Sequence, residues 1–182
     1  DNPLGKMKKN TAPNMFDYKY NRLFNYIPLE PSKATRGEIG IPRVLNFYDS
    51  YPFWFTLLTN LGFRVIISDD SSKKLYEKGI DTISSDSICY PAKLVHGHIL
   101  ALVEQKVDRI FYPIIPKEEK EFGCSTNSFN CPVVSGYPEV IRSSMDPEGK
   151  YGIPFDKPVV VFSDHKALEK ACARYCTSLG VS

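Results

Sequence analysis

The sequence predicts an α/β fold, with an open, mainly parallel sheet that carries helices on both faces, of Rossmann-like or flavodoxin-like type. Two observations favour this fold. From residue 38 onward, short apolar runs rich in valine and isoleucine alternate with amphipathic helical patterns. Such runs are typical of strands that are buried on both faces of a parallel sheet. Because ligands of these sheets bind beyond the carboxyl ends of the strands, we expect a functional site at that edge.

Composition excludes several classes of protein. The 182 residues are 42% hydrophobic and include 11 Tyr, 11 Phe and one Trp, which excludes a chain that is disordered over most of its length. The formal net charge of +2 is far from that of a nucleic-acid binder, so no nucleic-acid partner is expected. No apolar run approaches 18 residues, so no membrane partner is expected either.

The first residues predict a cytoplasmic segment of a longer polypeptide. The basic start of the chain is not followed by the apolar region of a signal peptide. Five cysteines at uneven spacings then favour reduced thiols or ligands over a disulfide framework. We expect residues 1–36, which show no clean periodicity, to be an irregular arm or linker, and residues 37–182 to form the α/β domain of a larger protein.

Each element of the predicted domain has its own signal. Apolar runs predict strands, and proline at a first helical position, serine or aspartate caps and terminal glycines delimit helices. The predicted strands are 43–48, 63–67, 109–112, 132–134 and 157–162, and the predicted helices are 52–61, 72–79, 91–103, 138–145 and 164–179. Residues 116–131 are expected to form a polar loop and residues 146–156 a turn-rich connection. A strand that starts at 132 would place Cys131 at the amino edge of the sheet.

Cys89 is the most suggestive single residue. It lies just before a predicted helix, whose positive amino end lowers a thiol pKa and favours an anion. Lys93, one turn into that helix, adds to the same field. The alternative is a half-buried thiol that packs beside Tyr90. The chain has no phosphate-binding loop, dinucleotide-binding turn, nucleophile elbow or zinc-protease helix that would indicate a different chemistry.

The other cysteines and histidines carry weaker signals. Cys124 and Cys131 are separated by six residues, which is not a zinc-ribbon spacing, so loop thiols are the alternative. Cys172 and Cys176 fall on the apolar face of the last predicted helix and are expected in the core. His96 and His98 are two residues apart on one helix, so they cannot chelate one metal ion together.

Three stretches taken together carry a family resemblance. They are Ile39-Gly40-Ile41-Pro42-Arg43 running to Tyr51-Pro52-Phe53-Trp54, then the run of residues 87–98 (SICYPAKLVHGH), then Asn130-Cys131-Pro132 with Tyr137-Pro138-Glu139-Val140. They resemble the conserved domain of large bacterial proteins related to the activators of 2-hydroxyacyl-CoA dehydratases. They are also distantly similar to the iron–sulfur subunits of 2-hydroxyacyl-CoA dehydratases and benzoyl-CoA reductases. The similarity covers about residues 17–170.

This resemblance implies a cysteine-ligated iron–sulfur cluster, for example of the [4Fe–4S] type, that passes a low-potential electron. By the same resemblance Cys89 and Cys131 are candidate ligands. The family usually has a cysteine where this chain has Ile114, and Cys124 is the candidate to replace it. The implied partners are an ATP-dependent activase module or other domains of the same polypeptide, together with an acyl-CoA.

Two functional hypotheses therefore stand side by side. The first is an iron–sulfur electron-transfer or reductase component of a 2-hydroxyacyl-CoA dehydratase or acyl-CoA reductase system, with clustered sulfurs. The second is a non-catalytic docking or ligand-binding module of a larger activase-related protein. It predicts separated thiols and a pocket at the strand ends lined by Tyr48, Tyr51, Cys89 and Lys93, of which Tyr51 and Lys93 would contact the ligand.

Overall fold

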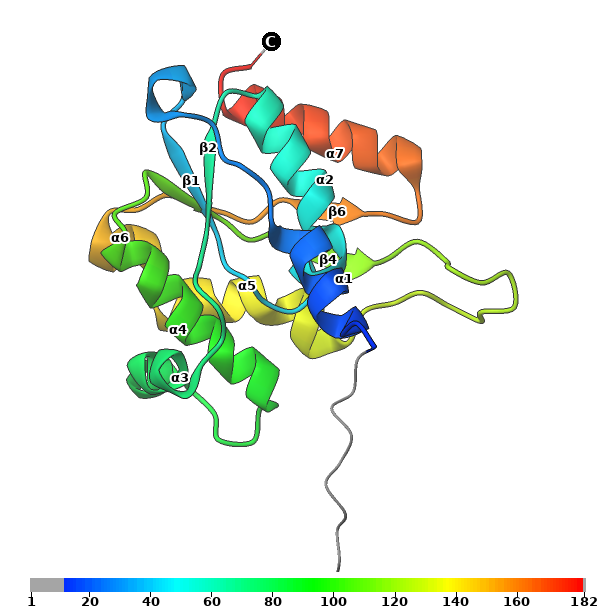
Figure 1. Cartoon of the computed structure of the whole chain (residues 1–182), viewed down its shortest axis with the longest axis horizontal. Coiled ribbons are helices and arrows are strands. Elements are labelled where there is room, and N and C mark those ends of the chain that lie inside the picture. The colour runs from blue at the N-terminus through cyan, green and yellow to red at the C-terminus, as the bar shows by residue number, and fades with distance from the viewer. Residues whose placement is uncertain (1–11, 182) are drawn as a thin grey trace, which may run out of the picture.

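The computed structural model describes residues 12–181, so the first eleven residues of the predicted arm lie outside the described residues (Figure 1). The strands are β1 (Glu38–Ile41), β2 (Arg64–Ile67), β3 (Arg109–Phe111), β4 (Ile114–Lys117), β5 (Phe155–Asp156) and β6 (Val159–Val161). The helices are α1 (Met15–Phe24), α2 (Phe47–Asn60), α3 (Lys73–Gly79), α4 (Tyr90–Glu104), α5 (Pro132–Ser144), α6 (Pro147–Tyr151) and α7 (His165–Ser178), with short 3₁₀ turns at Pro31–Lys33 and Ile80–Thr82.

All the strand pairs are parallel, which confirms the predicted fold class. Four strands pair in the order β2-β1-β3-β5, and β4 pairs with β6 in a second, two-stranded sheet. β3 and β4 are two parts of one interrupted strand, and β5 and β6 are two parts of another. Tyr112 N–H bonds to the Asp156 carbonyl at 2.8 Å and Ile114 N–H to the Pro158 carbonyl at 2.9 Å, so the ladder continues across the break. Pro113 and Pro158 interrupt the strands because proline has no N–H to donate.

Helices cover both faces of the sheet (Figure 1). On one face, Trp54 of α2 and Tyr175 of α7 both pack on Phe111 of β3, with ring centroids 4.7 and 5.3 Å apart. On the other face lies α4, because a Cβ on Gly40 would meet the Leu102 side chain at 3.0 Å. Helices α3 and α5 pack against α4. Within residues 12–181 no helix is long and apolar enough to cross a membrane.

The sequence predicts an irregular arm, but part of the arm is helical. Residues 15–24 form α1, which Asn14 caps by accepting hydrogen bonds from Phe16 and Asp17 N–H. Phe24 is 6% exposed and packs edge-on against Tyr48, with ring centroids 5.0 Å apart. The clean helical period is missing because α1 also bears apolar residues on its outer face: Met15, Phe16 and Tyr18 are all exposed.

The predicted strand at 43–48 is wrong. The first strand is β1, residues 38–41, and the chain turns at 42–46 before α2 begins at Phe47. The buried residues of α2 recur every three or four positions, and this helical period outweighs the β propensity of Val44 to Tyr48. Pro52 lies inside α2 and does not open it.

The predicted strand at 132–134 is also wrong, because Pro132 is the first residue of α5 and proline suits that position. The predicted loop at 116–131 begins with the end of β4, and the turn-rich stretch contains the short helix α6. The other predicted elements are confirmed, with shifts of a few residues at their ends: β2, α3, α4, β3, β6 and α7.

Candidate functional site

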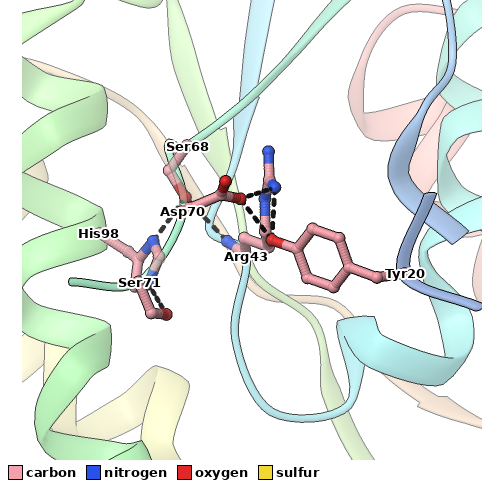
Figure 2. Close-up of polar contacts among 6 residues, drawn as sticks. All are labelled: Tyr20, Arg43, Ser68, Asp70, Ser71 and His98. Atoms are coloured by element: carbon pink, nitrogen blue, oxygen red, sulfur yellow. Dashed lines mark hydrogen bonds and ion pairs between the residues drawn. The ribbon is translucent and has the colours of Figure 1, made fainter. Parts of the chain in front are cut away.

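A polar cluster lies where β1 and β2 end (Figure 2). The Arg43 guanidinium, just after β1, pairs with the Asp70 carboxylate, which follows β2. Arg43 Nη1 also donates to the Tyr20 hydroxyl at 2.6 Å, and Tyr20 in turn donates to Asp70. The cluster therefore joins the arm to two strand ends. Arg43 Nε is buried and has no hydrogen-bond partner among the described residues.

His98 of α4 extends this cluster into the core. Its Nδ1 lies 2.8 Å from Ser68 Oγ and its Nε2 lies 2.9 Å from Ser71 Oγ. Ser68 Oγ also accepts a hydrogen bond from the backbone N–H of Arg43 at 2.8 Å. Burial lowers the pKa of His98 to about 4, and the charge of Arg43 acts in the same direction. His98 is therefore neutral at pH 7 and ties α4 to the end of β2.

The two cysteines that the resemblance selects have equivalent places in the fold. Cys89 is the N-cap residue of α4 and Cys131 the N-cap residue of α5. Both thiols are exposed, and neither side chain caps its helix by a hydrogen bond. The expected position of Cys131 at the amino edge of a strand is thus corrected. The amino ends of α4 and α5 lie on the same side of the molecule in Figure 1.

Tyr137 of α5 links the two helices beside Cys89. Its hydroxyl lies 3.0 Å from His96 Nε2, and His96 Nδ1 lies 2.8 Å from Thr82 Oγ1. Because Thr82 donates its hydrogen to the Gly79 carbonyl, its oxygen accepts from Nδ1–H, so neutral His96 accepts the Tyr137 hydrogen at Nε2. Burial raises the pKa of Tyr137 to about 12, and the nearby Cys89 adds to this effect.

An acidic cavity of about 350 Å³ lies at the carboxyl ends of β4 and β6. It opens between the first turns of α2 and the loop that follows β4. Its lining residues are Asp49, Ser50, Phe53, Glu118, Glu119, Lys120, Glu121 and Phe162. Burial raises the pKa of Glu118, and the carboxylate of Asp49 raises it further, while a hydrogen bond from Asn130 opposes both.

The residues of the predicted ligand pocket do not line the acidic cavity. Tyr51 is 1% exposed and packs in an aromatic cluster with Phe24, Tyr26 and Phe55. Lys93 Nζ donates to the Asp86 carbonyl at 2.8 Å. Cys124 is exposed in the loop between β4 and α5. The cavity at this edge is lined by other residues.

The thiols alone do not make a complete cluster site. Iron–sulfur clusters are held by about four cysteine thiolates. Across residues 12–181, no group of three or more His, Cys, Asp or Glu side chains is placed to hold a metal ion. Cys131 lies six positions before Tyr137, about 9 Å along α5, whereas Cys89 lies near Tyr137 itself. The described residues thus offer two thiols at most and do not fit a cluster held by this chain alone.

Sequence reasoning missed the residues that define this edge. Arg43 lies in the predicted strand 43–48 and Tyr20 in the predicted irregular arm, so neither is predicted to form a site. The run Glu118-Glu119-Lys120-Glu121 directly after an apolar segment was a usable signal, because it places carboxylates at a strand end. Local sequence does not group Asp49 with that run, since Asp49 lies 69 residues before Glu118.

Comparison with known proteins identifies the domain. Residues 38–182 match the CoA enzyme activase uncharacterised domain, and the matched region starts at the first residue of β1. The chain belongs to this family. No curated protein and no solved structure gives a significant match.

The match divides the polar cluster between two parts of the chain. Arg43, Asp70 and His98 lie inside the activase-related domain, whereas Tyr20 lies in the arm that precedes it. The acidic cavity and the cysteines at the starts of α4 and α5 also belong to the domain. The family therefore gives the chain an activase-type context. The function is inferred from the local geometry.

Proposed function

We propose that this chain is a docking module of an activase-related protein, which binds a protein partner at the carboxyl edge of its sheet. The observation that carries the proposal is the acidic cavity between Asp49, Phe53 and Glu118. It lies where ligands of parallel α/β sheets bind. Phe122 and Phe129, on the loop that supplies Glu118 to Glu121, are also exposed. Exposed apolar side chains next to charged ones are typical of protein interaction sites.

Electrostatics favours a protein partner over an acyl-CoA in this cavity. Four carboxylate residues line it against one lysine, and Lys120 Nζ already donates to the Ser125 carbonyl at 3.1 Å. The phosphates of an acyl-CoA would meet like charge there, which is unfavourable. The partner that the family context suggests is the ATP-dependent activase module or another domain of the same polypeptide.

The test is a direct binding measurement between this chain and the ATP-binding activase module of the same organism, by isothermal titration calorimetry. We expect a saturable heat that weakens as salt is raised, because exposed charges contribute to docking. The variant Asp49→Asn/Glu118→Gln should weaken binding, and Glu77→Gln, an exposed carboxylate change on α3, should not. Absence of binding by the wild-type chain, with the activase module alone or loaded with nucleotide, would overturn the proposal.

A second function is favoured by one specific observation, the matched pair of exposed cysteines at the starts of α4 and α5. In this alternative Cys89 and Cys131 supply two thiolates to an iron–sulfur cluster whose other ligands come from a partner chain. The positive ends of two packed helices would stabilise the negative thiolates. A bound cluster would supply low-potential electron transfer.

Iron and acid-labile sulfide distinguish the two functions. The measurement uses protein that is purified without oxygen, alone and together with its partner, for wild type, Cys89→Ala and Cys131→Ala. Iron that appears only with the partner and is lost in both variants would establish the shared cluster. Iron that is absent under every condition would leave docking without a cluster.

A further inference from the structure

Three of the four carboxylates of the acidic cavity have no cationic partner among the described residues, and the fourth, Glu119, lies 3.5 Å from His165 Nε2. Within residues 12–181, no lysine or arginine forms an ion pair with Asp49, Glu118 or Glu121. Glu118 is bound by the neutral amide of Asn130 at 3.0 Å. Burial raises the pKa of Glu118, and the nearby carboxylate of Asp49 adds to the rise. The cavity therefore has an excess of negative charge.

The walls of the cavity are aromatic as well as acidic. Phe53 and Phe162 meet edge to face, with ring centroids 5.4 Å apart and ring planes at 79°. Phe53 is 38% exposed, so part of its ring faces the open side. Aromatic faces attract cations, and a planar guanidinium both stacks on such rings and forms paired hydrogen bonds with carboxylates. An ammonium group fits this combination less well, because it is more strongly hydrated.

We propose that the acidic cavity receives an arginine side chain from a basic segment of the protein partner. The guanidinium lies against Phe53 and Phe162 and is bound by the carboxylates of Asp49 and Glu118. This inference rests on the proposed docking function and adds the chemistry of the partner. Charge complementarity selects the occupant, since four carboxylate residues and two aromatic rings line the cavity against one lysine, whose Nζ donates to the Ser125 carbonyl.

The surroundings favour a protein segment over a free cation. Phe122 is 66% exposed and Phe129 67% exposed, and both lie on the loop that supplies Glu118 to Glu121. A small cation inside the cavity would leave these rings in water. An extended or helical segment with apolar residues beside its arginine would cover them, and burial of apolar area is the main source of affinity in such contacts.

The test uses two synthetic peptides of the same length, one of alternating arginine and leucine, the other with citrulline in place of arginine. Citrulline keeps the shape of the side chain but has no charge, and a carbonyl oxygen replaces one NH2 donor of the guanidinium. Binding to the ¹⁵N-labelled chain is followed by NMR. We expect the arginine peptide to shift the amide signals of Phe53, Glu118 and Phe162, with at least tenfold tighter binding than its citrulline twin.

Variants make the test specific to the cavity. Glu118→Gln retains an oxygen that can accept from Asn130, so the loop should stay folded, and we expect about tenfold weaker binding of the arginine peptide. Phe53→Leu should weaken binding through the lost ring, and Glu77→Gln on α3 is the matched control. Equal binding of the two peptides, or undiminished binding by Glu118→Gln, would overturn the inference.

Two further outcomes separate this inference from the docking function. If N-acetyl-arginine amide binds as tightly as the peptide, the cavity is a small-cation site and the inference fails. If the activase module binds the wild-type chain and Asp49→Asn/Glu118→Gln equally well, docking stands and only the arginine contact is excluded. If the activase module does not bind at all, the docking function fails whatever the peptides do.

Discussion

The hydroxyl of Tyr20 accepts a hydrogen bond from Arg43 Nη1 at 2.6 Å, although Tyr20 lies in the arm and Arg43 in the first loop of the activase-related domain. The guanidinium also lies over the rings of Tyr20 and Phe24, 5.5 and 5.1 Å from their centroids. Phe24 is buried. A segment outside the family domain is thus fastened to the carboxyl edge, beside the candidate site.

Replacing Tyr20 with phenylalanine should loosen the arm without removing its aromatic contacts. The variant loses the hydroxyl that bridges Arg43 and Asp70, and we expect the free energy of unfolding to fall by about 1 kcal/mol. Limited proteolysis should then cut near α1 faster. Tyr18→Phe is the control, because Tyr18 is 58% exposed. Equal proteolysis of the two variants would show that the hydroxyl does not hold the arm.

Two helical glycines should respond to alanine in opposite directions. A Cβ on Gly97 of α4 would lie 1.9 Å from the Leu75 carbonyl oxygen of α3, so Gly97→Ala should lower the free energy of unfolding by about 1–3 kcal/mol or more. A Cβ on Gly136 of α5 meets no atom within 4 Å, and Gly136→Ala should raise stability by about 0.5–1 kcal/mol. Urea unfolding of both variants measures these changes, and a Gly97→Ala variant as stable as the wild type would contradict the packing of α3 on α4.

The two buried histidines should make the fold sensitive to acid. Burial lowers the pKa values of His96 and His98 to about 4, from an ordinary value of 6.5. Between these pH values the unfolded chain binds more protons than the folded one. The two histidines therefore leave the free energy of unfolding unchanged above pH 6.5 and lower it as the pH drops towards 4. We expect the urea midpoint to decrease over this range. NMR should show both imidazoles still neutral at pH 5.5, and protonated rings in the folded state at that pH would refute the burial argument.

Four of the five thiols should fall into two classes of reactivity. Cys89, Cys124 and Cys131 are exposed and should react promptly with Ellman's reagent in the folded protein. Burial raises the pKa of Cys172 on α7, and Cys176 nearby adds to it, so Cys172 should react slowly. Single Cys→Ser variants assign each phase. Slow reaction of Cys89 or Cys131 would mean that the helix starts are covered, contrary to the structure.

Local pattern was enough for much of the fold. The apolar runs at 63–67, 109–112 and 157–162 and the helical periods of α4 and α7 predicted strands and helices that the structure confirms, with small shifts at their ends. These elements bury one face or both faces against the core, so their periodicity reports their structure directly. The resemblance in residues 39–54, 87–98 and 130–140 likewise identified the family that the comparison shows.

Where two local signals competed, the sequence alone did not decide. Residues 43–48 and 132–134 have high β propensity, but Phe47 and Pro132 begin helices because burial at helical spacing along α2 and α5 outweighs that propensity. Cys131 therefore lies at the start of a helix and not of a strand, as Cys89 does. Short segments therefore need their tertiary partners before their structure is defined.

The sequence by itself determined the fold class, the family and the place of Cys89 before a helix, because each depends on residues close together in the chain. Only the tertiary structure brought Asp49 to Glu118, Tyr20 to Arg43 and Tyr137 to Cys89. These pairs are 69, 23 and 48 residues apart. The physical reason is that a parallel sheet collects the carboxyl ends of distant strands at one edge, and the register of those strands is set by packing of the core.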